Sequence, residues 1–203
     1  MPAAPVLAAA VPPTTRVAHV GMGAATVGLA GLPALVTVAR GGTDLSVPIV
    51  LLALGTGASL AWGADDPAED LLAPNPVSSP VRATIRVLAV AIAAALVCCA
   101  VLGVVAVGPG LPPDLLDRAP ELAAAAALAL AVAFGAARHG ERIAGPSGVL
   151  AGLTGPLFIA ALAVRWPTLF PTVTAGPLHN RWWIVVVAGA LVTIRSARDP
   201  AHR

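Results

Sequence analysis

The feature that most constrains this chain is a series of long apolar stretches separated by short connections. A bilayer core is about 30 Å thick, so a helix that crosses it needs roughly 20 apolar residues. Backbone polar groups in lipid must be paired within their own segment, so we expect helices and not open strands. Six stretches approach or reach the required length, at residues 17–39, 46–63, 81–107, 120–137, 146–166 and 182–196.

Composition favours a membrane protein over a soluble one. Of the 203 residues, 58% are hydrophobic and 11% are charged, whereas a soluble domain has about 25% charged residues. The mean hydropathy is +0.88. A soluble fold of this length cannot bury so much apolar surface, because much of a small protein faces water. We therefore predict an all-α, polytopic membrane protein with six transmembrane helices.

Arginine positions predict the orientation. The sequence has no lysine, so all 12 basic residues are arginines. Six spans put both termini and the second and fourth connections on one side, which is predicted to be the cytoplasm because cytoplasmic loops are enriched in basic residues. That side holds Arg16, Arg82, Arg86, Arg138, Arg142, Arg195, Arg198 and Arg203, and the other side holds Arg40, Arg118, Arg165 and Arg181.

The ends of the chain and its amino-acid bias complete the expected organisation. Residues 1–16 are rich in Pro and Ala and lack the basic start of a signal peptide, so we expect a retained, disordered cytoplasmic lead-in. Residues 17–198 form the predicted six-helix domain, and 199–203 form a cytoplasmic tail. Arginine in place of lysine, with abundant Ala, Gly and Pro, indicates a GC-rich bacterial genome and hence the bacterial plasma (inner) membrane.

The connection WGADDPAEDLLAPNPVSSPVR, residues 62–82, is the acidic passage of the chain. Asp66 suits a helix N-cap, Pro67 the first helical position and Glu69 the capping-box acid, so a short cytoplasmic helix is predicted at 66–72. This helix either lies on the membrane surface as a capped turn or docks into a cytoplasmic partner. The predicted docking residues are Asp66, Glu69, Asp70, Leu71 and Leu72, with Arg82 and Arg86 as a basic collar at the membrane surface.

The sequence lacks the residues that several kinds of catalytic or binding site require. Without lysine there is no G-x-x-x-x-G-K-[ST] phosphate loop, and no H-E-x-x-H or G-x-S-x-G motif is present. The acids at 65–70 lack the ligand alternation and glycine of a calcium loop, and no basic stripe suits nucleic acid. We therefore predict no catalytic, cofactor-binding or metal residue. The polar groups inside the spans are Thr26, Thr56, Ser59, Thr154 and Thr193, whose hydroxyls can bond their own helix backbone.

Small residues and aromatic residues give further expectations. Four-residue spacing places small side chains on one helix face, where backbones approach closely, although such pairs also arise by chance in a chain rich in Ala and Gly. The tryptophans are expected at the membrane boundary, with wet N–H groups. The apolar segment 166–180 is predicted to be a re-entrant or surface-lying hairpin, or else an ordinary loop. The predicted helix-packing pairs are Gly148 with Gly152, Ala24 with Gly28, and Gly55 with Ser59.

Taken together, these features resemble the membrane half of an ABC exporter. The resemblance lies in six spans with both ends inside, the capped helix at 66–72 and the apolar hairpin at 166–180, and it covers most of the chain in topology more than in motif. The stretch DDPAEDLL also resembles small membrane proteins of GC-rich bacteria that accompany ABC ATPases. The proline-rich lead-in departs from the amphipathic first helix of the family.

The resemblance implies a function and partners. Asp66, Glu69, Leu71 and Leu72 would contact a separate cytoplasmic ATPase subunit, which would carry the ATP and magnesium. The chain would be a permease-like subunit that pairs with a second copy or a paralogue and exports a hydrophobic or amphipathic substrate. A non-transporting scaffold or accessory subunit of a larger membrane complex is the alternative.

Overall fold

The structure is a computed structural model that describes residues 13–65, 79–113, 115, 119–139, 144–165 and 182–196. These ranges contain helices and no strand, and four of the helices are long and apolar enough to cross a membrane. This confirms the all-helical, multi-pass class. In chain order the elements are α2 (Pro13–Ala39), α3 (Ser46–Ala58), η1 (Ser59–Ala64), α5 (Ser79–Val107), α6 (Ala119–Arg138), α7 (Gly145–Arg165) and α8 (Trp182–Ser196).

The helix bounds follow the predicted spans with small differences. α2 begins at Pro13, four residues before the predicted span. The second span is continuous from Ser46 to Ala64, but its last six residues are a 3-10 helix, η1. Because a 3-10 helix rises about 2.0 Å per residue and an α-helix 1.5 Å, η1 brings this 19-residue span to about 31 Å, close to the thickness of a bilayer core.

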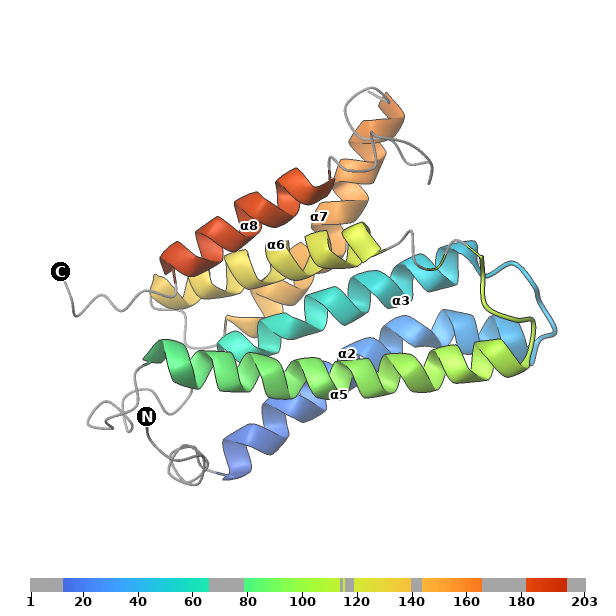
Figure 1. Cartoon of the computed structure of the whole chain (residues 1–203), viewed down its shortest axis with the longest axis horizontal. Coiled ribbons are helices and arrows are strands. Elements are labelled where there is room, and N and C mark those ends of the chain that lie inside the picture. Colours follow the sequence, from blue (N-terminus) through green and yellow to red (C-terminus); the bar gives the residue numbers. More distant parts are fainter. Residues whose placement is uncertain are drawn as a thin grey trace.

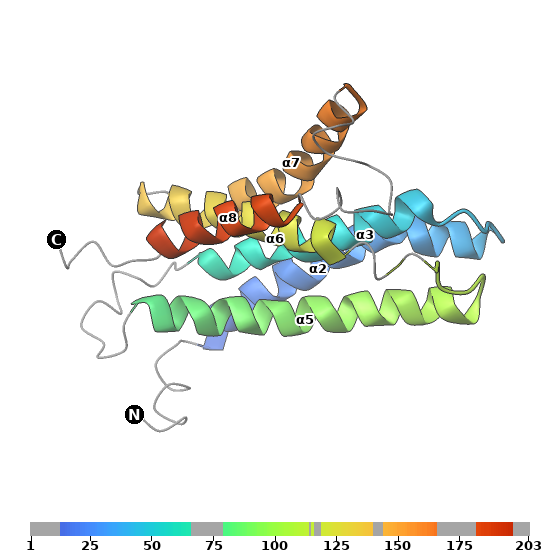
Figure 2. The same cartoon turned by 45° about the horizontal axis from the view of Figure 1, so that its top comes forward.

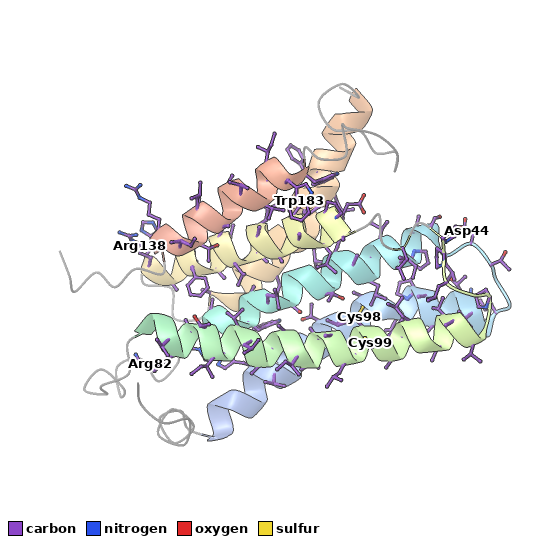
Figure 3. The ribbon with its side chains drawn as sticks, viewed as in Figure 1. Asp44, Arg82, Cys98, Cys99, Arg138 and Trp183 are labelled. Carbon is purple, nitrogen blue, oxygen red and sulfur yellow. The ribbon has the colours of Figure 1, made fainter. Side chains whose placement is uncertain are left out.

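Successive helices run in alternating directions (Figure 1). The start of α2 and the end of α8 therefore lie at the same end of the bundle. That end also holds Arg82 and Arg138 (Figure 3), together with Arg86 near the start of α5 and Arg195 in the last turn of α8. We call it the arginine-rich end. The opposite end holds the turn from α2 to α3, which includes Asp44.

The turn between α2 and α3 is held by backbone and side-chain hydrogen bonds. Gly41 adopts a φ of +70°, and its N–H donates to the carbonyl of Val38 while that of Gly42 donates to Thr37. These two bonds form the Schellman motif that ends α2. The Asp44 carboxylate then accepts hydrogen bonds from the backbone N–H and the hydroxyl of Ser46, at the start of α3. The chain therefore reverses direction within a few residues.

The helices form two groups of three. α2 packs on α3 and α5, and α6 packs on α7 and α8, while α3 and η1 make the extensive contacts between the groups, chiefly with α6 and α7 (Figure 2). α5 and α8 lie on different sides of the molecule and expose apolar side chains along their length, as expected of helices that face lipid. Among these exposed residues are Leu88, Ile92, Leu96, Ile184, Val187 and Leu191.

Two hydrophobic clusters hold the bundle together. The branched cluster lies toward the Asp44 end, where α2, α3 and α5 meet, and includes Val27, Leu52, Val101 and Val105. The alanine cluster lies toward the arginine-rich end, where η1 meets α6. Its buried members are Ala58, Ala61, Ala64, Ala129 and Ala133.

The 3-10 geometry of η1 explains the alanine cluster. With three residues per turn, side chains at i and i+3 are eclipsed, so Ala58, Ala61 and Ala64 form one ridge. Gly148 and Gly152 of α7 lie against this ridge and against α6: a Cβ on Gly148 would come within 2.6 Å of the Ala61 Cβ, and one on Gly152 within 2.8 Å of the Ala58 Cβ. We refer to this contact of η1, α6 and α7 as the small-residue seam.

Candidate functional site

Polar contacts gather where η1 ends, at the arginine-rich end of the seam. Asp65, the residue that follows η1, is only 5% exposed. Its Oδ1 accepts hydrogen bonds from the backbone N–H groups of Ala144 and Gly145, each at 2.7 Å. Gly145 is the first residue of α7. One carboxylate oxygen of the first helix group therefore holds the start of a helix of the second group.

The sequence of α7 explains why it needs this distant acceptor. The first N–H groups of a helix have no partner within the helix, and Ser, Thr, Asp or Asn at the N-cap usually accepts from them. Here the residue before Gly145 is Ala144, which has no polar side chain, and Pro146 has no N–H. The Asp65 carboxylate supplies the missing cap, and its charge also complements the helix dipole.

The environment of Asp65 acts on its pKa in both directions. Burial raises the pKa of the Asp65 carboxyl above its ordinary value of 3.8, while the hydrogen bonds from Gly145 and Ala144 and the nearby His19 and Arg86 act to lower it. Burial is the largest influence, since a carboxylate removed from water loses solvation that these contacts only partly replace. The carboxyl of Asp65 therefore binds a proton more readily here than it would in water.

Two arginines of α5 lie at the same end. Arg86 is 7% exposed, and its Nε donates to the carbonyl oxygen of Gly63 in η1 at 3.3 Å. Arg82 is 4% exposed. Both arginines lie at the end of the bundle, where a basic collar at the membrane surface was predicted, but their side chains are buried within the protein. Arg86 instead satisfies a carbonyl near the end of η1 and ties α5 to it.

Trp62 differs from the boundary tryptophan that we expected. Its indole N–H donates to the hydroxyl of Thr26 in α2 at 3.0 Å, so this group is satisfied inside the protein. Trp182 is also buried, whereas Trp183 is 47% exposed. The hydroxyls of Thr26, Thr56, Thr154 and Thr193 donate to the carbonyl four residues earlier, and that of Ser59 donates to Thr56, which confirms backbone bonding inside the spans.

Glycines allow the close approach of backbones around Asp65. A Cβ on Gly145 would lie 2.7 Å from both Asp65 Oδ2 and Trp62 Cε3, and one on Gly63 would lie 2.5 Å from the Cα of Val87. Contacts under 3.0 Å force a shift of the neighbours. Alanine at either position would therefore push α7 or α5 away from η1.

The predicted helix-packing residues divide into two sets. Gly148, Gly152, Gly55 and Ser59 lie at tight contacts: Gly55 faces Ala30 of α2, and Ser59 is fully buried. The remaining pair, Ala24 with Gly28, is different, because a Cβ on Gly28 would meet nothing within 4 Å. Four-residue spacing of small residues thus coincides with close contacts in α3 and α7, whereas Gly28 of α2 has open space around it.

The predicted docking residues Asp66, Glu69, Asp70, Leu71 and Leu72 lie outside the described residues, as does the predicted outer hairpin at 166–180. The connection that contains the docking residues starts directly after Asp65. Their docking role stays a prediction. Among the described residues, no group of three or more His, Cys, Asp and Glu is placed to hold a metal ion.

Asp65 is the site residue that the sequence analysis missed. Its partners lie 79 and 80 residues away in the chain, so no local spacing indicates the contact. The signal present is indirect: α7 begins without a capping side chain, and Asp65 is the first of the acidic residues that follow the second apolar span. Comparison with protein-family models, curated proteins and solved structures gave no match.

Proposed function

We propose that this chain is the permease-like membrane subunit of an ATP-driven exporter, with ATP and magnesium bound by a separate cytoplasmic ATPase. The observation that carries the proposal is the division into two helix groups that meet mainly along α3 and η1. Alternating access needs two bodies that move against each other, and a contact of alanines and glycines has no long interlocking side chains to resist a shift.

The position of Asp65 supports coupling at the arginine-rich end. Residues 66–78 connect η1 to α5, and Asp65 at the start of this connection also holds α7. A force applied to the connection by a cytoplasmic partner would therefore reach both helix groups. By the positive-inside rule we place the arginine-rich end, with both termini, in the cytoplasm of a bacterial inner membrane.

The distribution of charge favours an apolar cargo. Among the described span residues, charged side chains lie near the helix ends, as for Arg82, Arg86, Glu121 and Arg138. An ion-coupled carrier usually places an ionisable group near the middle of the membrane. We therefore propose a hydrophobic or amphipathic substrate, and a second copy or a paralogue as the other half of the pathway.

Affinity purification from native membranes in mild detergent tests the proposal. We expect a tagged chain to recover a protein with a G-x-x-x-x-G-K-[ST] motif and magnesium-dependent ATP hydrolysis. Leu71→Asp with Leu72→Asp should abolish recovery, because charge on the apolar face opposes docking. Val77→Asp with Ser78→Asp adds the same charge to the same connection and should leave recovery unchanged. Recovery of no ATPase by the wild-type chain would contradict the proposal.

A specific observation favours a second candidate, a non-transporting scaffold. A Cβ on Gly57 would lie 2.5 Å from the carbonyl oxygen of Leu122, so the backbones of α3 and α6 are already in close contact. Such packing suits a fixed support as well as a sliding contact. A scaffold would co-purify with its complex and leave the ATP hydrolysis rate unaffected by substrate, whereas a permease subunit would make hydrolysis substrate-dependent in proteoliposomes.

A further inference from the structure

Among the hydrogen bonds described above, those of Asp65 join the two helix groups at the arginine-rich end. The bond from Trp62 to Thr26 and the bond from Arg86 to Gly63 both lie within the first group, α2 to α5. The bond from Arg138 to the carbonyl of Arg195 lies within the second group, α6 to α8. The two bonds to Asp65 instead run from the start of α7 to the end of η1.

We propose that Asp65 is a latch that holds the two helix groups closed at the arginine-rich end, and that releasing its carboxylate from the start of α7 lets the α6–α8 group move away. This inference concerns the chain alone and goes beyond the proposed export function. It can be tested on the isolated chain, without a partner protein.

The residues around the contact explain why this one carboxylate has a large effect. The seam beside it contains alanine and glycine, whose short side chains contribute little interlocking. Without the Asp65 acceptor, two buried N–H groups at the start of α7 would lose their hydrogen bonds. Unpaired N–H groups are stabilised by hydrogen bonds to water, and an outward movement of α7 would expose them to water.

The fit at Gly145 makes the latch sensitive to distance. Oδ2 of Asp65 and the ring of Trp62 both lie where a Cβ on Gly145 would be placed. Trp62 is in turn fixed to α2 by its bond to Thr26. The carboxylate therefore has little freedom to follow α7, and a small outward shift breaks both hydrogen bonds together.

Distance measurements on the full chain, purified in lipid nanodiscs, test the latch. In a background of Cys98→Ala and Cys99→Ala, the substitutions Leu88→Cys in α5 and Leu150→Cys in α7 place spin labels at two exposed positions in different helix groups. Double electron–electron resonance then measures the distance between the two groups. With the native Asp65 in place, we expect one narrow distribution of distances between the labels. Asp65→Ala should shift the closed-to-open ratio by more than about tenfold and add a longer distance.

Two further variants separate the latch from a loss of fold. Asp65→Asn keeps an oxygen acceptor and should retain the wild-type distribution. Gly145→Ala keeps the carboxylate but pushes α7 away, so it should also add the longer distance, while Gly135→Ala, where a Cβ meets nothing within 4 Å, should not. If Asp65→Ala does not fold, the distance distribution of Gly145→Ala tests the proposal in its place. Wild-type distributions in folded Asp65→Ala and Gly145→Ala would overturn the proposal.

Discussion

The two ends of α3 and η1 are packed in different ways. Toward the Asp44 end, Leu52 inserts among branched side chains of α2 and α5, including Val27 and Val101. Toward the arginine-rich end, η1 presents an alanine ridge to glycines and alanines of α6 and α7. The first contact is held by the shape of side chains, and the second by close backbones and one buried carboxylate. A single span is therefore held by interlocking side chains toward one end and by close backbones toward the other.

The largest expected effect comes from adding volume where α3 packs on α6, next to the small-residue seam. Gly57→Leu would place a side chain where even a Cβ lies 2.5 Å from the Leu122 oxygen and 2.8 Å from the Ala126 nitrogen. We expect a loss of more than about 3 kcal/mol in the free energy of unfolding, because backbone atoms cannot move aside. Denaturant titration in detergent, followed by circular dichroism, measures it. Gly103→Leu, in open space on α5, should lower the free energy of unfolding only slightly. Equal losses for the two variants would contradict the tight packing of α3 on α6.

Removing volume from the branched cluster should have the next largest effect. Leu52→Ala leaves a cavity at a side chain that is 2% exposed. We expect a loss of about 2 kcal/mol, at the low end for such changes, because lipid reduces the benefit of transfer from water. The same titration checks it, with exposed Leu96→Ala as the matched control. A cost at Leu52 no greater than that at Leu96 would contradict tight packing in this cluster.

A smaller effect should appear as a pH dependence at Asp65. Burial raises its folded-state pKa above the ordinary 3.8, so the folded state binds the proton more tightly than the unfolded state. The stability of the wild type relative to Asp65→Asn should therefore fall as pH rises from below 3.8 through the folded pKa, and then stay level. Thermal unfolding of both proteins between pH 3 and pH 8 tests this. A difference that grows with pH would show the opposite balance of burial and charge.

The smallest effect is expected at Asp44, in the exposed turn at the other end. Its bonds to Ser46 lower the pKa of the carboxyl. The stabilisation from Asp44 should be present above about pH 4 and be lost as pH falls through the lowered pKa. Asp44→Ala should remove this acid sensitivity and little else in thermal unfolding. A loss as large as that of Leu52→Ala would mean that the turn, and not the branched cluster, holds this end.

Sequence patterns predicted the helices well because span length and apolar content depend on the bilayer alone. They also found Gly148, Gly152 and Gly55, since close packing requires small residues. They could not find which face of α2 or α5 is packed, because helices that are apolar on all sides carry little periodicity. They did not indicate that a Cβ on Gly28 would meet nothing within 4 Å, or that the side chains of Arg82 and Arg86 are buried.

The remaining differences depend on tertiary contacts. Trp62 finds its acceptor on α2, 36 residues away, and Asp65 finds its donors on α7. The 3-10 form of η1 has no local signal such as proline. Its tighter winding aligns Ala58, Ala61 and Ala64 toward α6 and α7, so the packing partners select it.

A reversible disulfide across the seam tests the central claim most directly, that two helix groups shift along small-residue contacts. The Cβ atoms of Ala61 and Ala133 lie within 2.7 Å of the point where a Cβ on Gly148 would be placed, so they are neighbours across the seam. We expect Ala61→Cys with Ala133→Cys, in a background of Cys98→Ala and Cys99→Ala, to form a disulfide under an added oxidant. In the complex with the co-purified ATPase, we predict that oxidation abolishes substrate-dependent ATP hydrolysis and that reductant restores it. Full substrate-dependent hydrolysis by the oxidised complex would contradict the account.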